Sequence, residues 1–577
     1  MRHLRWQVLI ALLGMVLVGG LLAGQGQGGS PIVEIKEPAP GGRYIEALVG
    51  APQRLNPLLD FANPVDRDID RLVFAGLTRF DDSGLPAPGL ATWSIAADQV
   101  TYTFILKPNL QWHDGQPLTT EDVAFTVSLL QDSNYPGPAD VGRLWQSVRV
   151  EIISPQIVVF TLPEPFAPFL DYTAIGLLPQ HLLGDVSAAD LPEAGFNQNP
   201  VGSGPFKVER FTQTAGGANS LLLSAFPGYA GPQPNIAQVQ FNFYPDAASA
   251  LAAYQRGEVL GVSRLEKGQM AEALKLPELG LHTSLLPEYS LIFLNLRDET
   301  LPFFKDKKVR QALLLGMNRQ AMVQSILDGQ AVVANSPVLP GSWAYNESLP
   351  VATYDPETAA GLLESAGWVL PADAVQGTET YVRQKDGVPI NFTLAVPNDP
   401  VHVAIAQATQ VTWARLGVRT EIAPVEPDTL RADYLEPRAF QAILVDFSLA
   451  GTPDPDPYPL WHETQAESGQ NYSGFSDRLT SELLEQARIT TDITQRAQLY
   501  RSFQSRFADQ APALLLYYPV YNYGVDVNVN GVQIGPLTER SDRFNNFASW
   551  YIVTRRVIVE NPSPEEQQSG PTPEATP

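Results

Sequence analysis

The sequence predicts an α/β protein with more than one domain. Residues 392–396 are typical of a strand, 403–416 of a helix and 418–422 of another strand, and this βαβ order indicates a parallel or mixed sheet. A second strand-and-helix unit lies over 101–130. The chain has 577 residues, more than one ordinary hydrophobic core accommodates, so two or three domains are expected.

The unit at 101–130 shows how local chemistry predicts each element. Large apolar side chains alternate with Thr and Ile over 101–106, as in a strand that is buried on at least one face. Asp114 and Gly115 form a turn signal. Thr119 or Thr120 can cap the next helix, whose first turn carries two acidic residues where the helix dipole favours negative charge.

Similar patterns predict the other elements. Asp355 is expected to cap a helix that has Pro356 in its first turn and ends at Gly367. A hairpin is expected over 147–161. Further strands are predicted at 44–49, 206–211, 239–243, 292–296, 442–447 and 514–518, and further helices at 68–74, 246–257, 304–315, 477–488 and 492–509.

Composition excludes several classes of function. The net charge of -24 argues against nucleic acid as a partner, because binding phosphates needs a basic face. The chain has no cysteine, so disulfides, thiolate metal sites and cysteine nucleophiles are excluded. His462 and Glu463 do not continue into a zinc-protease motif, and Asp454 and Asp456 lack the glycine and distal glutamate of a calcium loop. We therefore expect no cofactor, no metal and no catalytic residues.

The N-terminus carries a targeting signal. Basic residues precede an apolar run over 8–23, which is the pattern of a signal peptide or a membrane anchor. Gln25 occupies the position at which a lipoprotein has its lipidated cysteine, so lipid attachment there is excluded. We expect an uncleaved anchor that places the rest of the chain outside the cytoplasm, with cleavage as the alternative.

Several motifs resemble one family of proteins. The sequence reads Tyr-Thr-Phe-x-Leu-Lys at 102–107 and Trp-His-Asp-Gly-x-Pro-Leu-Thr-x-Glu-Asp-Val at 112–123. It continues with Asn-Pro-Val-Gly-Ser-Gly-Pro-Phe at 199–206 and Tyr-Asp-Pro-Glu at 354–357. These motifs, in this order, resemble the family 5 solute-binding proteins, which are the oligopeptide and dipeptide receptors of ABC importers.

The resemblance implies a fold and a domain arrangement. The implied fold is α/β, a two-lobed periplasmic-binding-protein-like (type II) fold with a third, smaller inserted domain. On the sequence this gives a signal or membrane anchor (1–24), a linker (25–42), lobe I (43–75, 199–289 and 511–559), the inserted small domain (76–198), lobe II (290–510) and a disordered tail (560–577).

The resemblance also implies a function. The expected protein is an extracytoplasmic receptor that closes its lobes around a peptide or similar polar oligomer, delivers it to an ABC permease, and works as a monomer. The expected ligand-binding residues are Gln53, Tyr135, Asp446, Phe447, Gly451, Thr452, Tyr458 and Trp461. Each aromatic residue in this set is also a candidate core residue.

The ligand class stays open at this point. Peptide-binding members resemble one another in an aspartate that pairs with the amino terminus of the peptide, and Gly451 occupies the matching position here. A desolvated amine needs a carboxylate partner, and Asp446 is the candidate substitute. Oligosaccharides and metal chelates are therefore alternative ligands. An extracellular hydrolase and a membrane-tethered scaffold are the alternatives from other functional classes.

Overall fold

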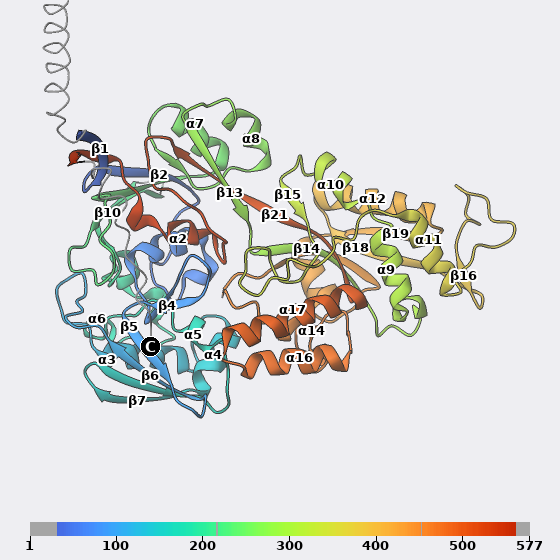
Figure 1. Ribbon diagram of the computed structural model, residues 1–577, viewed down its shortest axis with the longest axis horizontal. Coiled ribbons are helices and arrows are strands. Elements are labelled where there is room, and N and C mark those ends of the chain that lie inside the picture. The colour runs from blue at the N-terminus through green and yellow to red at the C-terminus, as the bar shows by residue number, and fades with distance from the viewer. Residues whose placement is uncertain (1–31, 215–216, 452, 561–577) are drawn as a thin grey trace, which may run out of the picture.

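β21 (Ala513–Asp526) is the strand on which two lobes of the molecule meet. The computed structural model describes residues 32–214, 217–451 and 453–560. Within them, β21 belongs to a twelve-stranded sheet that extends through both lobes (Figure 1). Its residues 513–519 pair with β14 (Glu288–Leu294) and β15 (Ala331–Val333), and its residues 520–526 pair with β13 (Leu279–Leu285) and β12 (Gly261–Val262). The predicted strand at 514–518 is thus confirmed, and it is longer than expected.

The first lobe contains the half of the sheet that begins at β21 and ends at β9. The strand order is β21, β12, β2, β11, β10, β9, and β2 runs parallel to both β11 and β12. The strands not yet described are β2 (Arg43–Val49), β9 (Phe206–Thr214), β10 (Gly217–Ala225) and β11 (Gln238–Tyr244). Its helices are α2 (Pro64–Val73), α7 (Ala247–Gln255) and α8 (Lys267–Ala273).

The second lobe contains the other half of the sheet, in the order β19, β18, β20, β14, β21. β18 (Asn391–Pro397) runs parallel to β19 (Arg419–Val425) and to β20 (Ala442–Ser448), which confirms the predicted βαβ unit. The connecting helix α12 begins after Asp399, whose side chain accepts the backbone amides of Val401 and His402.

Other helices cover the second lobe. They are α9 (Lys307–Leu315), α10 (Arg319–Ser325), α11 (Pro356–Ser365), α12 (Pro400–Arg415), α14 (Tyr458–Trp461), α16 (Arg478–Ile489) and α17 (Ile493–Gln510). Asp355 caps α11 as predicted, and α16 and α17 match the two late helices expected from periodicity. Among the described residues this lobe has three hydrophobic clusters: one around Phe392 and Trp413, one around Phe293 and Phe503, and a smaller one that includes Val338 and Tyr500.

A smaller sheet lies below the first lobe in Figure 1. Its strand order is β5, β6, β8, β7, and it contains the expected hairpin of β7 and β8. Thr119 and Asp122 form a reciprocal cap at the start of α3, as the sequence predicts. The elements are β5 (Ala91–Ile95), β6 (Thr101–Leu106), β7 (Arg149–Ser154), β8 (Ile157–Thr161), α3 (Thr120–Gln131), α4 (Ala139–Ser147), α5 (Phe169–Tyr172) and α6 (Gln180–Leu183), all within the predicted insertion at 76–198.

Some element boundaries differ from the sequence predictions. The linker expected at 25–42 contains a strand, β1 (Ile32–Ala39), which pairs antiparallel with β22 (Val553–Glu560), so Glu560 belongs to a strand and not to the tail. The first helix begins at Pro64, four residues before the predicted 68, because the Asn63 side chain accepts the Val65 amide and caps it. The anchor expected at 1–24 and residues 561–577 lie outside the described residues.

Over the described residues 32–214, 217–451 and 453–560, no helix combines the length and the apolar composition that a bilayer span requires.

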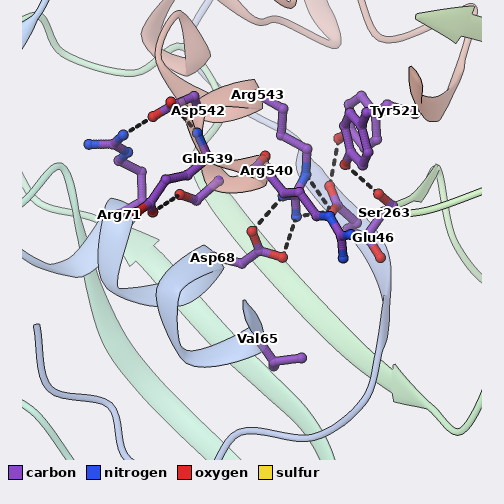
Figure 2. A network of polar contacts seen from close by, with 12 residues as sticks. Glu46, Val65, Asp68, Arg71, Ser263, Tyr521, Glu539, Arg540, Asp542 and Arg543 are labelled. Carbon is purple, nitrogen blue, oxygen red and sulfur yellow. Dashed lines mark hydrogen bonds and ion pairs between the residues drawn. The ribbon is translucent and has the colours of Figure 1, made fainter. Parts of the chain in front are cut away.

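A buried ion network holds the first lobe together. Arg543, in the short helix η6 (Arg540–Phe544), is fully buried and donates to Glu46 of β2 and to Asp68 of α2 (Figure 2). The Glu46 carboxylate also accepts the hydroxyls of Tyr44 and Tyr523. Burial alone would lower the pKa of Arg543, but the Asp68 and Glu46 carboxylates raise that pKa well above its usual value. One cation thus joins β2, α2, β21 and the C-terminal segment.

The Arg543→Ala variant tests how much this network contributes to the free energy of unfolding. It leaves the Glu46 and Asp68 carboxylates buried without a cation, so we expect a loss of about 3–5 kcal/mol in the free energy of unfolding, measured in urea. Arg149→Ala removes an exposed ion pair with Glu151 and should change stability by less than about 1 kcal/mol. Equal effects of the two substitutions would contradict the central role of Arg543.

Candidate functional site

A large cavity lies between the two lobes. Its volume is about 1000 Å³, at the upper end of the range for small-molecule sites, ~300–1,000 Å³. The first lobe contributes α2 and the segment 534–541, and the small domain contributes parts of α4 and α5. The second lobe contributes residues 339–343, 447–451, 453–456, 459 and 460. A ligand in this cavity would therefore contact both lobes.

Helix α2 presents one face to the cavity. Arg67, Asp70, Arg71 and Phe74 all line it, at the spacing i, i+3, i+4 and i+7 that places residues on one side of a helix. Asp68 points about 100° around the helix from Arg67, and Arg543 binds it there (Figure 2). The buried ion network thereby fixes the rotation of α2 that directs these side chains towards the cavity.

The second-lobe wall is formed by the end of β20 and the segment that follows it. It includes Phe447, Gly451 and the acidic residues Asp454 and Asp456. Asp454 pairs with Arg496 at 2.5 Å, and Asp456 pairs with Arg488 at 2.7 Å. These arginines come from α16 and α17, so the wall is tied to the helical layer beneath it. The two aspartates considered as a calcium pair thus each have an arginine partner.

The small domain contacts this wall directly. The backbone amide of Asp454 donates to the Asp171 carboxylate at 2.8 Å, and the amide of Ala167 donates to the Arg488 carbonyl at 2.7 Å. Burial, and then the neighbouring Asp454 carboxylate, raise the pKa of Asp171 well above its usual value. These contacts close the cavity on the side of the small domain.

The charges that line the cavity are mainly acidic. Within the described residues seven lining side chains are acidic and two, Arg67 and Arg71, are basic. Arg67 lies 3.7 Å from Asp60 and 3.1 Å from Glu539, and Arg71 pairs with Asp542. The acidic side chains are Asp60, Asp70, Asp140, Asp171, Asp454, Asp456 and Glu539.

Two carboxyl groups beside α2 have strongly perturbed titration. Burial raises the pKa of Asp60 to about 7, and Arg67 offsets this only in part. Burial, followed by the charges of Asp60 and Asp66, raises the pKa of Asp70 well above its usual value. Perturbed acids that share a cavity are frequent at functional sites.

Three of the residues predicted from the sequence line the cavity. Tyr135 lies at the first-lobe side, where its hydroxyl donates to the Leu58 carbonyl at 3.3 Å. Phe447 and Gly451 lie on the second-lobe wall, and Phe447 stacks on Tyr289. Gly451 has φ of +133°, a conformation that residues with a side chain rarely adopt. The structure brings these three residues together around one space.

The other predicted residues lie off the cavity lining. Gln53 is exposed, and its backbone amide donates to Asp66. Asp446 accepts from His402 Nε2 at 3.0 Å. Tyr458 lies between His462 and Arg488, and Trp461 is a buried core residue that packs on Phe507. Thr452 lies outside the described residues.

Sequence reasoning missed the charged residues of α2 and the loop residue Trp343. The first group had a usable signal, because Arg67, Asp70 and Arg71 recur on one helical face in a segment that the resemblance places at the cleft. Trp343 lies in an irregular segment without periodicity, so only the fold places it at the cavity.

Within residues 32–214, 217–451 and 453–560, no three or more His, Cys, Asp or Glu side chains form a group that could hold a metal ion.

Comparisons with known proteins agree on one family. The model of the bacterial extracellular solute-binding proteins, family 5 (middle), matches residues 86–470. The oligopeptide-binding protein AppA of Bacillus subtilis (strain 168) is 29% identical over 527 residues, covering 89% of this chain and 92% of AppA. The dipeptide-binding protein of Escherichia coli (strain K12) is 27% identical over 533 residues, covering 85% of this chain and 91% of that protein.

Solved structures show the same relationship. The structure of AppA from Bacillus subtilis in complex with a nonapeptide has a TM-score of 0.65 and 28% identity, covering 90% of this chain and 100% of AppA. NikZ from Campylobacter jejuni in complex with Ni(L-His) has a TM-score of 0.66 and 25% identity, covering 88% of this chain and 99% of NikZ. The two-lobed α/β architecture predicted from the sequence is confirmed.

The Asp60→Asn variant tests the cavity electrostatics through pH. The folded protein holds the Asp60 proton between pH 3.8 and about 7, where the unfolded chain has lost it, so the contribution of Asp60 to stability falls as the pH rises through this range. We expect the melting temperature of the wild type to fall more than that of Asp60→Asn between pH 5 and pH 8. Asp373→Asn, at an exposed site, is the control. Parallel curves for wild type and Asp60→Asn would show that Asp60 titrates normally.

Proposed function

Because this chain belongs to family 5 of the bacterial extracellular solute-binding proteins, we propose that it binds a peptide or similar polar oligomer between its lobes and delivers it to an ABC permease. The observation that carries the proposal is a cavity of about 1000 Å³ lined from both lobes. The relatives named above are peptide-binding proteins by description, and they match this chain over nearly its whole length.

The connections between the lobes support a mechanism of closure. The chain passes from the first lobe to the second through β13 and β14, and it returns through β21. Between β13 and β14 only Leu286 and Pro287 intervene, so the lobes can rotate about a narrow region. A ligand that contacts both walls favours the closed arrangement, because those contacts are lost when the lobes separate.

The finer parts of the function are also proposed. We infer an extracytoplasmic protein that is held at the membrane by residues 1–24, acts as a monomer and has no catalytic activity. The lobe boundaries given in the sequence analysis are part of this proposal. The family contains binding proteins rather than enzymes, which supports the absence of catalysis.

A metal chelate is the second candidate ligand. The similarity to NikZ, whose structure contains Ni(L-His), supports it. A chelate brings its own metal ligands, so it does not need a cluster of His or Asp side chains in the protein.

Thermal denaturation of the full chain, refolded from denaturant to remove any co-purified ligand, tests the proposal. We expect peptides of two to nine residues to raise the melting temperature, because ligand at a hundred times its Kd adds about 2.7 kcal/mol to stability. Nickel–histidine and oligosaccharides are tested alongside. Stabilisation by one of these and not by peptides would replace the peptide assignment, and no stabilisation by any of them would contradict a receptor function.

The Phe447→Ala variant tests whether the wall binds the ligand. Phe447 is a half-buried aromatic residue on the lining, and aromatic residues at such positions carry much of the binding energy. We expect the Kd for a stabilising peptide to rise roughly tenfold, about 1.4 kcal/mol, as measured by calorimetry. Gln53→Ala, an exposed site off the cavity, should leave the Kd unchanged. The same change in both variants would place the ligand elsewhere.

A further inference from the structure

Asp70 is a buried carboxylate that lacks a partner. It lines the cavity from α2, it is 3% exposed, and neither of its oxygens has a hydrogen-bond partner. The backbone amide of Asn56 and the guanidinium of Arg67 are near enough to lower its pKa, but burial and the acidic neighbours outweigh them. A buried polar group without a partner costs free energy, so its presence calls for an explanation.

The neighbouring carboxylates are all occupied. Asp66 accepts the backbone amides of Gln53 and Arg54 at 2.7 and 2.8 Å. Asp60 lies near Arg67, which also pairs with Glu539. Arg67 and Arg71 are the basic side chains of the cavity within the described residues, and both have acidic partners. Among the described residues no basic side chain forms an ion pair with Asp70, and Nε of the adjacent Arg71 is also buried without a hydrogen-bond partner.

The surroundings of Asp70 suit a positive charge. Asp60 is close enough to act electrostatically on both Asp70 and Tyr135. Tyr135 and Phe74 line the same side of the cavity, and aromatic faces attract cations. Seven lining side chains are acidic and two are basic, although Asp454 and Asp456 are paired with Arg496 and Arg488 from outside the lining.

We propose that Asp70, with Asp60 beside it, is the anchor for a cationic group of the ligand, either a primary ammonium or a guanidinium. This inference rests on the proposed function and deepens it, because it assigns the ligand class as cationic. The anchor lies on the first lobe, and the carboxylates of the second-lobe wall, Asp454 and Asp456, already have arginine partners. Binding then brings the missing partner to Asp70 and forms a buried ion pair with it.

The test uses the full chain and tetrapeptide probes that differ in charge. The probes, all with an amidated C-terminus, are tetra-alanine, N-acetyl-tetra-alanine, and N-acetylated tetrapeptides of alanine with one lysine or one glutamate at the second position. Binding to the wild type and to Asp70→Asn is measured by calorimetry. The Asp70→Asn variant should not melt at a lower temperature than the wild type, because the amide loses no hydrogen bond that the carboxylate makes.

For the wild type we expect the two probes that carry an ammonium group to bind at least tenfold more tightly than the neutral and acidic probes. In Asp70→Asn this preference should disappear through weaker binding of the cationic probes, while the neutral probe binds as before. Asp373→Asn, which removes one negative charge at an exposed site, should keep the preference.

Three results would overturn the inference. Equal binding of cationic and neutral probes by the wild type would show that no cation is selected. A preference that persists in Asp70→Asn would show that another group selects it. The proposed function itself fails in a different way: no peptide probe of any charge binds, and the inference, which depends on that function, falls with it.

Discussion

The buried pairing of Arg543 with Glu46 and Asp68 is the constraint on which the first lobe depends. The three residues lie far apart in the sequence, and they join the first strand of the sheet, the first helix and the C-terminal segment. Tyr523 of β21 shares the Glu46 carboxylate, so the strand that links the lobes is part of the same network. A network of this kind is weak evidence for added stability, but removal of one member leaves uncompensated charge. It serves here to fix how α2 and β21 are placed relative to each other.

That placement determines the cavity. Arg543 holds Asp68 and so fixes the rotation of α2, which turns Arg67, Asp70 and Arg71 towards the cavity. β21 connects the second lobe to the same network, because its first half pairs with β14 and its second half pairs with β13. The position of α2 on the first-lobe side of the cavity and the position of the second-lobe wall thus both depend on one buried cation, Arg543.

Local patterns in the sequence predicted most of the fold. Alternation, capping residues and turn signals located the βαβ unit, the hairpin of β7 and β8, and the cap at Asp355, because each depends on residues within a few positions. The pairing of β1 with β22 was missed because its partners are separated by almost the whole chain. The same limit applies to the extent of β21, which depends on strands from both lobes.

The candidate site could be predicted only in part. Tyr135, Phe447 and Gly451 were placed by resemblance and do line the cavity. Trp461 is aromatic like Phe447 and follows it closely in the sequence, yet it lies in the core against Phe507. An aromatic residue has no local signature that separates a core position from a cavity wall, because both positions are apolar. Tertiary contacts alone make this distinction.

The two walls of the cavity differ in whether their acidic side chains have partners in the protein. This difference bears on how the receptor would work. Asp454 and Asp456 have arginine partners on α16 and α17, so the second-lobe wall is neutralised and rigid before any ligand arrives. Asp70 on the first-lobe floor has no hydrogen-bond partner. Proteins retain such local costs mainly at functional sites. A cationic ligand would provide a partner for Asp70, which removes the free-energy cost of its burial, and would contact the second-lobe wall at the same time. The free energy released at Asp70 would then be available to favour closure of the lobes.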